Sequence, residues 1–400
     1  MIGINNVISV NFDIITESAS VGAYDTVVYI TNDILNKNGE VATEVLCKDL
    51  AEVEAAVGNE VIYQSAKVYF ENYGKKLLLL TASAYTLEAF KNDIQRARAI
   101  TNNFIFINIT NTLIGETSAG EEGTIGYSFD TLVEIANYCD NTKSPYKIRL
   151  CLTTNSINFI KEKGLLNYNV AVKYATKVYN SKLLDLSLLI GAYFTRINLD
   201  GEDTIKDYCY TREIVIADKE KLGAEEVTQA QFEVLVNNPE GEEGYYNFID
   251  KIGADVVNFG GNYANIKTLP IHTDFGAIAI ENDITYSVLE LMIGKQYLTD
   301  AGLANVKAAI HNQLQRYKTN GYLNPGASYS GEDLVIKYNS RTFNVIKKGT
   351  ILSQGFYVYT IPVVNISDAD RASKKFPPIY VVMETQSGAR VVEITGEIRA

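Results

Sequence analysis

The sequence contains few of the residues that enzymes most often use for proton transfer. Its 400 residues include two histidines and no tryptophan. His311 shares the polar face of a predicted helix with lysine and glutamine side chains, which indicates a solvated position. His272 lies in the segment LPIHTDFG, where a turn is the favoured interpretation and an acid–base pair with Asp274 is the alternative.

Cysteine is also scarce, and the phosphate and nucleophile motifs of common enzymes are absent. Cys47, Cys139, Cys151 and Cys209 form no C-x-x-C pair, so we expect free buried thiols rather than disulfides or a metal site. No G-x-x-x-x-G-K-[ST] or G-x-S-x-G segment occurs. The sequence therefore predicts a protein that is not an enzyme, has no catalytic residue and uses no cofactor.

Two acidic segments have some features of ligand sites. The segment GEEGTIG (120–126) has spaced glycines, but its two glutamates would repel a phosphate group. Asp200, Glu202 and Asp203 could hold calcium in principle, yet this run lacks the spaced oxygen ligands of an EF-hand loop. We interpret both segments as surface turns and expect no bound metal.

An excess of positive charge and long apolar runs are lacking as well. The net charge of -12 and the pI of about 4.9 argue against nucleic acid as a partner. The most apolar segment, LLDLSLLIGAYF (183–194), is too short to span a membrane and contains Asp185. The N-terminal sequence has no basic region followed by an apolar block, so it shows no Sec-type signal. We expect a soluble protein made in a cytosol, with no membrane partner.

Strand and helix patterns alternate regularly through the first half of the chain. Apolar runs predict strands over 25–31, 77–80, 104–109, 146–152 and 169–175. Amphipathic segments predict helices after the caps Asp49 and Asn59, over about 87–99, over 129–139 and near 155–163. This alternation is typical of an α/β core with a mostly parallel sheet and flanking helices, which we place at residues 21–197.

The pattern changes twice in the second half of the chain. Residues 198–250 are acidic and rich in turn residues, which predicts a surface excursion. Residues 251–325 contain a strand and two helices, predicted over 283–297 and 299–321, that would complete the core. After the linker NPGASYSG, residues 326–400 carry mainly strand patterns, so we expect a β-rich C-terminal α+β domain.

Both ends of the sequence have the period-two pattern of half-buried strands. The apolar positions are Ile8, Val10, Phe12 and Ile14 in an N-terminal arm of about residues 1–20, and Val392, Ile394 and Ile398 in a hairpin that runs to residue 400. A strand with one apolar face needs further strands beside it. We therefore predict that both are extended arms that pair with other strands.

Three motifs carry a resemblance to a known family. Near the C-terminus, KKGTILSQGFYVYT leads through DADRASKKFPPI to a hairpin. Before it, LTDAGLANVKAAIHNQLQRYKTNGYLNPG predicts a helix that ends in an N-G-x-x-x-P-G turn, and DLAEVEAAVGNEVIYQSAKVYFENYGKKLLLL joins two helices to a strand. In this order the motifs resemble the contractile tail sheath proteins of long-tailed, myovirus-type bacteriophages and related phage tail-like particles. Where this family carries a large insertion after the strand at 77–80, the chain continues directly into further α/β elements.

The resemblance implies a structural subunit that polymerises as stacked hexameric rings around a tail tube and contracts to drive the tube through a host envelope. It also implies that terminal strands are shared between neighbouring subunits, and that the tail tube, baseplate and tail terminator proteins are partners. The expected location is the virion, after assembly in the host cytoplasm. The alternatives are an α/β enzyme with an appended β domain and a self-assembling shell or adhesin protein.

Basic residues are concentrated near the C-terminal hairpin of this acidic chain. A solvated surface is one interpretation, and docking to an acidic neighbouring surface is the other. On the resemblance, an acidic tail tube would be that surface. The candidates for facing it are Lys307, Arg316, Lys318, Arg371, Lys374 and Lys375.

Overall fold

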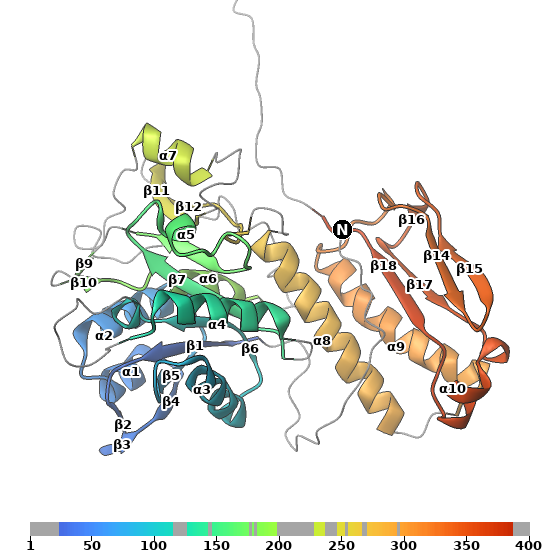
Figure 1. The fold of residues 1–400 in the computed structure, drawn as a ribbon, viewed down its shortest axis with the longest axis horizontal. Coiled ribbons are helices and arrows are strands. Elements are labelled where there is room, and N and C mark those ends of the chain that lie inside the picture. The colour runs from blue at the N-terminus through green and yellow to red at the C-terminus, as the bar shows by residue number, and fades with distance from the viewer. Residues whose placement is uncertain are drawn as a thin grey trace, which may run out of the picture. The chain divides into compact units, whose positions relative to one another are not determined.

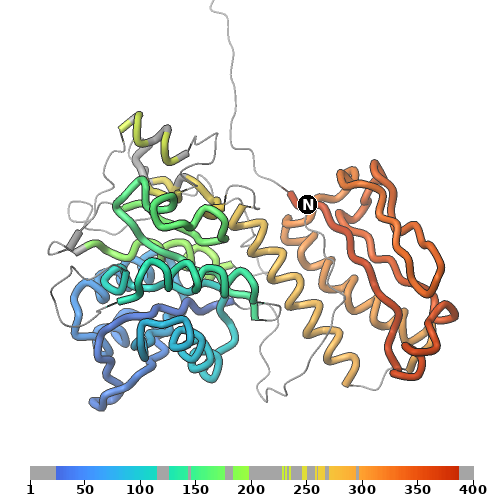
Figure 2. Tube along the Cα trace, viewed as in Figure 1, coloured from blue at the N-terminus to red at the C-terminus, as the bar shows by residue number. Residues whose placement is uncertain are grey.

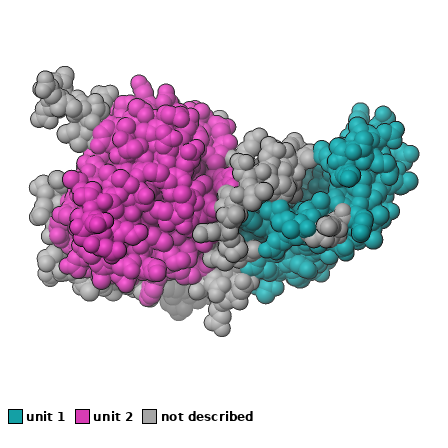
Figure 3. Space-filling view, turned by 90° about the horizontal axis from the view of Figure 1, so that it is seen from below, with its two compact units in different colours: residues 1–22, 198–206, 276–388 teal, residues 23–197, 207–275, 389–400 magenta. Residues whose placement is uncertain are grey.

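The computed structural model contains two compact units. It describes residues 24–114, 126–142, 146–175, 178–179, 182–197, 228–236, 246–252, 255–265, 270–293 and 297–386. Unit 1 comprises residues 1–22, 198–206 and 276–388, whereas unit 2 comprises residues 23–197, 207–275 and 389–400 (Figure 3). Unit 2 contains an α/β layer, and unit 1 contains the C-terminal strands (Figure 1).

Unit 2 is organised around a sheet that has six strands in its described part. The strand order is β4-β5-β1-β6-β7-β8, and the bounds are β1 (Thr26–Thr31), β4 (Glu44–Cys47), β5 (Lys76–Thr81), β6 (Phe104–Ile109), β7 (Arg149–Thr154) and β8 (Ala171–Tyr174). Every neighbouring pair is parallel except β4 with β5. The predicted mostly parallel sheet is therefore confirmed.

The central strands owe their position to uniformly apolar sequences. In β1 (TVVYIT) and β6 (FIFINI) every residue is buried, and in β5 the four leucines are buried. Continuous apolar runs of this kind are typical of parallel strands that are covered on both faces. The sequence-based strands over 25–31, 77–80 and 104–109 agree with the structure to within one residue at each end.

Side-chain caps set the start of the main helices of unit 2. These helices are α1 (Leu50–Ala56), α2 (Glu60–Glu71), α3 (Leu87–Ile100) and α4 (Phe129–Asn141). The capping side chains of Asp49, Asn59, Thr86 and Ser128 each accept a hydrogen bond from a backbone N–H in the first turn. Such N–H groups have no partner within the helix, so the caps satisfy them. The predicted caps Asp49 and Asn59 are confirmed.

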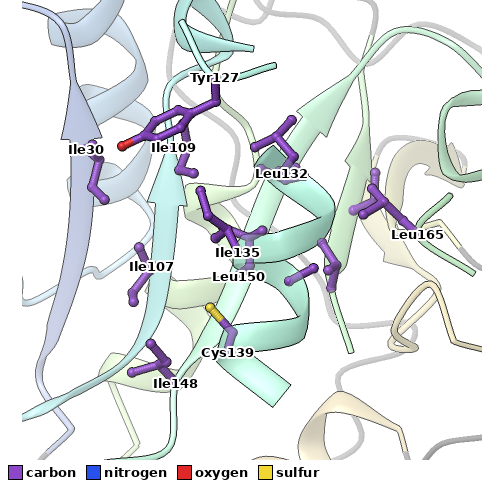
Figure 4. Packing of buried hydrophobic residues seen from close by; sticks show 14 of the residues in the cluster. Ile30, Ile107, Ile109, Tyr127, Leu132, Ile135, Cys139, Ile148, Leu150 and Leu165 are labelled. Carbon is purple, nitrogen blue, oxygen red and sulfur yellow. The ribbon is translucent and has the colours of Figure 1, made fainter. Parts of the chain in front are cut away.

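Helices α3 and α4 cover one face of the sheet. Leu132, Ile135 and Cys139 of α4 recur at intervals of three or four residues, which places them on one side of the helix. They share a buried cluster with Ile107 of β6 and Leu150 of β7 (Figure 4). This cluster joins the two helices to the central strands of the sheet and forms a large part of the apolar core among the described residues.

Helices α1, α2 and α6 (Leu188–Thr195) contribute to a second buried cluster, on the opposite face of the sheet. Gly191 of α6 lies very close to β1, because a Cβ atom built on it would stand 2.3 Å from Cγ2 of Val27. Only glycine allows the helix to approach the strand so closely. The apolar run at 183–194 is therefore a buried core segment. No helix in the described ranges is both long enough and apolar enough to cross a membrane.

Smaller elements complete the described part of unit 2. They are β2 (Leu35–Lys37), β3 (Glu40–Ala42), η1 (Asn111–Leu113), α5 (Phe159–Glu162), β9 (Val178–Tyr179), β10 (Lys182–Leu183), α7 (Gln229–Val236), β11 (Phe248–Ile252) and β12 (Asp255–Phe259). The helix predicted near 155–163 is only a single turn, α5. Most of the predicted acidic excursion, including Cys209 and the run Asp200–Asp203, lies outside the described residues, as does most of the segment 120–126.

The longest helix, α8 (Ile271–Ile293), starts earlier than the sequence pattern predicts. The interpretation of LPIHTDFG as a turn is wrong, because the helix begins directly after Pro270 and includes His272 and Asp274. The N–H of Asp274 donates to the carbonyl of Pro270 at 3.0 Å, which is the first hydrogen bond of this helix. The division between the units falls within α8, between Phe275 and Gly276.

Unit 1 combines helices with short antiparallel strand pairs. Its elements after α8 are α9 (Asp300–Thr319), β13 (Ala327–Ser328), β14 (Leu334–Tyr338), β15 (Arg341–Ile346), β16 (Ile351–Leu352), β17 (Phe356–Thr360), η2 (Val363–Asn365), α10 (Asp368–Ala372) and β18 (Ile379–Met383). In the described part the strands pair as β13–β16, β14–β15 and β17–β18. The predicted β-rich C-terminal region with helices is therefore present.

Helices α8 and α9 lie side by side in unit 1 (Figure 2). The Tyr317 hydroxyl of α9 donates to the buried Asp283 carboxylate of α8 at 2.9 Å. Thr299 caps α9, and the buried apolar stripe of this helix is formed by Leu303, Val306, Ile310, Leu314 and Tyr317. Residues 251–325 are predicted to complete the α/β core, whereas in the structure α9 and the part of α8 beyond Phe275 lie in unit 1.

Candidate functional site

The strand pair β17–β18 is one of the two-stranded sheets of unit 1 to which further strands can be added. It is antiparallel, with Phe356 opposite Met383 and Thr360 opposite Ile379. Within the part of the chain that the structure describes, this sheet has two strands, so the outer edge of each strand has no neighbouring strand. An exposed strand edge carries backbone N–H and C=O groups that can pair with an added strand.

Backbone hydrogen bonds connect the segment after β18, up to the last described residue, to the rest of unit 1. The N–H of Asn324 donates to the carbonyl of Glu384 at 2.9 Å, and the N–H of Gln386 donates to the carbonyl of Tyr322 at 2.8 Å. These bonds tie the segment after β18 to the loop that follows α9. They therefore fix the point from which residues 387–400 continue.

The predicted arm residues cannot be placed on this site. Residues 1–23 and 387–400 lie outside the described residues. The residues concerned are Ile8, Val10, Phe12, Ile14, Val392, Ile394 and Ile398. Their pairing between subunits therefore stays a prediction, although the strand at Ile379–Met383 agrees with the first half of the predicted hairpin.

The six basic candidates fall into two groups. Arg371, Lys374 and Lys375 are exposed and lie on or directly after the short helix α10, so the structure brings these three together. Lys307 and Lys318 are both on α9, and a spacing of eleven residues, about three turns, places them on one side of that helix. Whether any of them contacts a tube stays a prediction.

Two of the candidates on α9 are partly engaged within unit 1. Arg316 forms an ion pair of 3.4 Å with the buried Asp283, and Lys318 donates to the side-chain oxygen of Gln354. Residues 276–386 contain eleven lysines and arginines against nine aspartates and glutamates. This stretch is therefore slightly basic in a chain whose net charge is -12, which favours an acidic partner surface for it.

The suggested acid–base pair of His272 and Asp274 does not exist. Asp274 accepts two hydrogen bonds from the Arg149 guanidinium, at 2.7 and 3.1 Å, and a third from the Tyr263 hydroxyl at 2.8 Å. His272 is 3% exposed, and its Nε2 atom lies 3.1 Å from the hydroxyl of Thr273. The carboxylate therefore holds the first turn of α8 to β7 and does not activate a histidine.

The ion pair between Arg149 and Asp274, which anchors α8, is mostly buried. The Arg149 side chain is 6% exposed and the Asp274 side chain is 17% exposed. Burial by itself would lower the pKa of Arg149, but the nearby Asp274 carboxylate raises that pKa, so the guanidinium keeps its charge. The sequence analysis missed this pair, because the partners are 125 residues apart.

The described part of the chain shows no arrangement that points to metal or thiol chemistry. It contains no cluster of three or more histidine, cysteine, aspartate or glutamate side chains suited to a metal ion. Cys47, Cys139 and Cys151 are buried and free. Burial raises the pKa of Cys47 to about 12, so its sulfur stays a thiol near neutral pH.

Comparison with known proteins identifies the C-terminal region. Residues 271–398 match the family model for the "E217 tail sheath protein gp31-like, C-terminal domain". That match begins at the first residue of α8 and covers unit 1 from Gly276 onward. The resemblance to contractile tail sheath proteins is confirmed. No curated protein matches the chain in sequence.

The fold of the whole chain is similar to solved structures of contractile injection systems. A chain in the baseplate of the anti-feeding prophage matches with a TM-score of 0.65 and 15% identity over 98% of this chain and 100% of that one. The helical sheath of the same particle in its contracted state gives a TM-score of 0.63 with 16% identity, covering 98% and 99%. The contracted sheath complex of the PVC extracellular contractile injection system gives 0.62 with 13% identity, covering 98% of each chain. The chain therefore has the fold of these sheath proteins along its length.

Proposed function

We propose that this chain is the repeating subunit of a contractile sheath, which polymerises around a tail tube and contracts to drive the tube through a host envelope. The observation that carries this proposal is the fold similarity over 98% of the chain to a helical sheath in its contracted state. The tail sheath domain matched at residues 271–398 supports it independently. The enzyme and adhesin alternatives are not favoured by either observation.

The architecture fits a machine that works by rearranging rigid bodies. Unit 2 has a sheet covered by helices and a continuous apolar core, which resists deformation. Unit 1 presents strand pairs with free edges in its described part. A mesh of such subunits can shorten and widen while neighbours stay connected, because the units move as bodies about their links. The free energy would come from the difference between two packings, so no cofactor or enzymatic turnover is needed.

The terminal arms would provide the links between subunits. In this proposal, residues 1–20 and the end of the chain add strands to the free edges of β17 and β18 of neighbouring copies. Burial of Ile8, Val10, Phe12 and Ile14 would contribute roughly 1.5–3 kcal/mol each, against an ordering cost of roughly 1–2 kcal/mol per residue. These sums are comparable for the strand of residues 8–14 alone, so an arm should become ordered only when it also gains backbone hydrogen bonds in the assembly.

The assembly would consist of hexameric rings stacked helically in a phage tail or a related particle, formed in the host cytoplasm. Its partners would be the tail tube, the baseplate and the tail terminator. The exposed residues Arg371, Lys374 and Lys375 would face an acidic tube surface and set the register of the sheath on it. This contact would be salt-sensitive, because exposed charges are screened at high ionic strength.

Electron microscopy of the purified full chain tests the proposal. We expect negatively stained images to show rings or tubes that grow with protein concentration, and these should be hollow at the width of a tail tube. Monodisperse particles without higher-order structure at every concentration and salt condition, with and without tail tubes, would contradict it. A turnover reaction that requires a tightly bound nucleotide or metal would contradict the non-enzymatic part.

A further inference from the structure

The topology of the sheet in unit 2 defines where a small molecule would bind. After β1 the chain forms the sheet strands β4 and β5 on one side of β1 and then β6 on the other side, so the strand order reverses between β1 and β6. In open parallel sheets, ligands bind beyond the carboxyl ends of the strands at such a point. An enzyme with this sheet would be expected to place its site there.

In this chain a buried carboxylate occupies that place. Asp185 is 1% exposed. It accepts hydrogen bonds from the N–H of Asn111 at 2.7 Å, from the hydroxyl of Thr110 at 2.7 Å and from the hydroxyl of Tyr29. Thr110 and Asn111 directly follow the last residue of β6, and Tyr29 belongs to β1. The donors therefore come from the two strands on either side of the reversal.

The backbone around Asp185 is held in place independently of its side chain. The N–H of Asp185 donates to the hydroxyl of Ser65 on α2 at 3.0 Å, and the N–H of Ser187 donates to the hydroxyl of Thr153 on β7 at 2.9 Å. Helix α6 follows immediately and lies against β1 through Gly191. The fold thus positions the carboxylate from several sides.

The surroundings contain more polar groups than the carboxylate satisfies. The Asn108 side chain and the Ser187 hydroxyl are fully buried and have no hydrogen-bond partner among the described residues. Asn108 pairs with Tyr29 in the sheet register, and strand alternation puts it on the same face as Phe106, whose ring stacks on Phe194 of α6. Buried polar groups without partners are costly in an ordinary core, and each calls for an explanation such as an ordered water or a bound polar group.

We propose that the Asp185 carboxylate is an internal ligand that fills a latent carboxylate-binding site at the carboxyl ends of β1 and β6. The site is built from the Asn111 N–H and the hydroxyls of Thr110 and Tyr29. Its occupation by the chain itself closes the usual ligand position of this topology and locks α6 onto the sheet. This inference is about the folded monomer and does not depend on sheath assembly.

The test removes the internal ligand and supplies an external one. The Asp185→Ala variant of the full chain should lose about 5 °C or more in Tm. Sodium formate at about 100 mM should recover at least half of the lost Tm. Sodium chloride at the same concentration is the control, because it gives the same ionic strength. Wild-type protein and Asp185→Asn should not respond to formate, because their site is filled. Equal responses of all three proteins, or no loss in the alanine variant, would overturn the proposal.

A matched control comes from a second aspartate at the end of β1. Asp33 is half-buried, and its carboxylate accepts the N–H groups of Gly58 and Asn59 at 3.1 and 3.0 Å. Asp33→Ala should also lower Tm, because these N–H groups lose their acceptor. Formate should not rescue it, because water reaches that position. Rescue of Asp33→Ala to the same degree as Asp185→Ala would show a nonspecific salt effect and overturn the proposal.

A pH series on the wild-type protein and Asp185→Asn tests the proposal even if Asp185→Ala does not fold. Burial raises the pKa of Asp185 to about 6, against the opposing effect of its three hydrogen bonds. The groups that face the Asp185 side chain or backbone from β1, α2 and the end of β6 are Tyr29, Ser65, Thr110 and Asn111. Only Tyr29 among them titrates, and burial raises its pKa well above the ordinary value. The folded state thus binds this proton more tightly than the unfolded chain, whose aspartate pKa is about 3.9.

The sign of the expected pH effect follows from this difference. The part of the stability that comes from protonation of Asp185 is greatest below about pH 4 and is lost as the pH rises to about 6, whereas the hydrogen bonds that Asp185 accepts remain. Wild-type Tm should therefore fall relative to that of Asp185→Asn across this window. In addition, hydrogen exchange at the Asn111 amide should be faster in Asp185→Asn, because its amide oxygen fills the site but accepts this N–H more weakly than a carboxylate does, while exchange at the amides of β5 remains unchanged. Parallel pH curves together with unchanged exchange at Asn111 would overturn the proposal.

Discussion

The sheet of unit 2 and the strand pairs of unit 1 use apolar residues in different patterns. In β5 the sequence KLLLLT is buried across its four leucines, whereas in β14 the sequence LVIKY alternates between half-buried and exposed positions. The first pattern belongs to a strand covered on both faces, and the second to a strand with one covered face. The two units therefore differ in how far their own chain completes their packing.

The edges of the two sheets differ in the same way. The outer side of β8 is bonded to Asn247, whose N–H donates to Val172 and whose carbonyl accepts from Tyr174, at 2.8 and 2.7 Å. Across the described residues, β17 and β18 have no strand on their outer sides. Unit 2 thus uses its own chain to cover an edge that unit 1 leaves available. We therefore expect added strands to pair with unit 1 rather than with this edge of unit 2.

The largest expected effect comes from removing an arm that would cover the edges of unit 1. Deletion of residues 1–15, or Pro at Val10 or at Ile394, should abolish sheath formation, because proline cannot donate a ladder hydrogen bond. The monomer should keep its Tm and circular dichroism. Alanine at the polar position Ser9 serves as the matched control and should assemble normally. Contractile tubes built by the deleted protein would show that the arm does not link subunits.

A smaller but still large effect is expected at the ion pair that anchors α8. Asp274→Asn leaves the buried Arg149 guanidinium without its charged partner and should lower the free energy of unfolding by about 3–5 kcal/mol. The exposed pair Lys348–Glu332 in unit 1 is the control, and Lys348→Ala should cost less than about 1 kcal/mol. Denaturant titration measures both. Equal losses in the free energy of unfolding would mean that the buried ion pair of unit 2 stabilises the protein no more than the exposed pair of unit 1.

Truncation of apolar side chains compares the two strand patterns directly. Leu79→Ala in β5 removes a fully buried side chain and should cost about 2–5 kcal/mol. Val335→Ala in β14 removes a side chain that is 49% exposed and should change stability by about 0.5 kcal/mol or less. Chemical denaturation followed by fluorescence or circular dichroism gives both values. A large loss for Val335→Ala in the monomer would mean that unit 1 covers this strand by itself.

The smallest effect should appear at the charged surface of unit 1. Reversal of Lys374 and Lys375 to Glu should weaken assembly on tail tubes several-fold at low salt and less at high salt, without a change in Tm. The matched control is the same reversal at Lys347 and Lys348, which are also exposed and adjacent. Co-sedimentation with tubes across a salt series measures this. Identical co-sedimentation of both double variants would show that the basic residues after α10 do not contact the tube.

Much of the fold could be predicted because its signals are local. The caps Asp49, Asn59 and Thr299 and the buried stripe of α9 are visible within a few residues of sequence. The start of α8 was missed because LPIHTDFG contains turn-forming residues, and the helix is instead held by contacts with Arg149 and Tyr263. Tertiary contacts of this kind override local preference.

The internal carboxylate shows the same limit more clearly. In the sequence, Asp185 is only a charge that interrupts an apolar run, and it served to argue against a membrane span. Its hydrogen-bond partners Tyr29, Thr110 and Asn111 lie 156, 75 and 74 residues away. No spacing rule connects such positions, because they meet only after the sheet has assembled. A single acidic residue in an otherwise apolar segment was the one available signal.

The sequence by itself determined the alternating strands and helices, the acidic balance and the motifs that resemble tail sheath proteins. It could do so because helix caps, apolar periodicity and family motifs depend on residues that are close in the chain. Only the tertiary structure decided that α8 continues into unit 1, that Asp274 pairs with Arg149 and that β17 and β18 have free outer edges in the described part. These features depend on which distant segments come together, and that is set by the packing of the whole chain rather than by any short stretch of it.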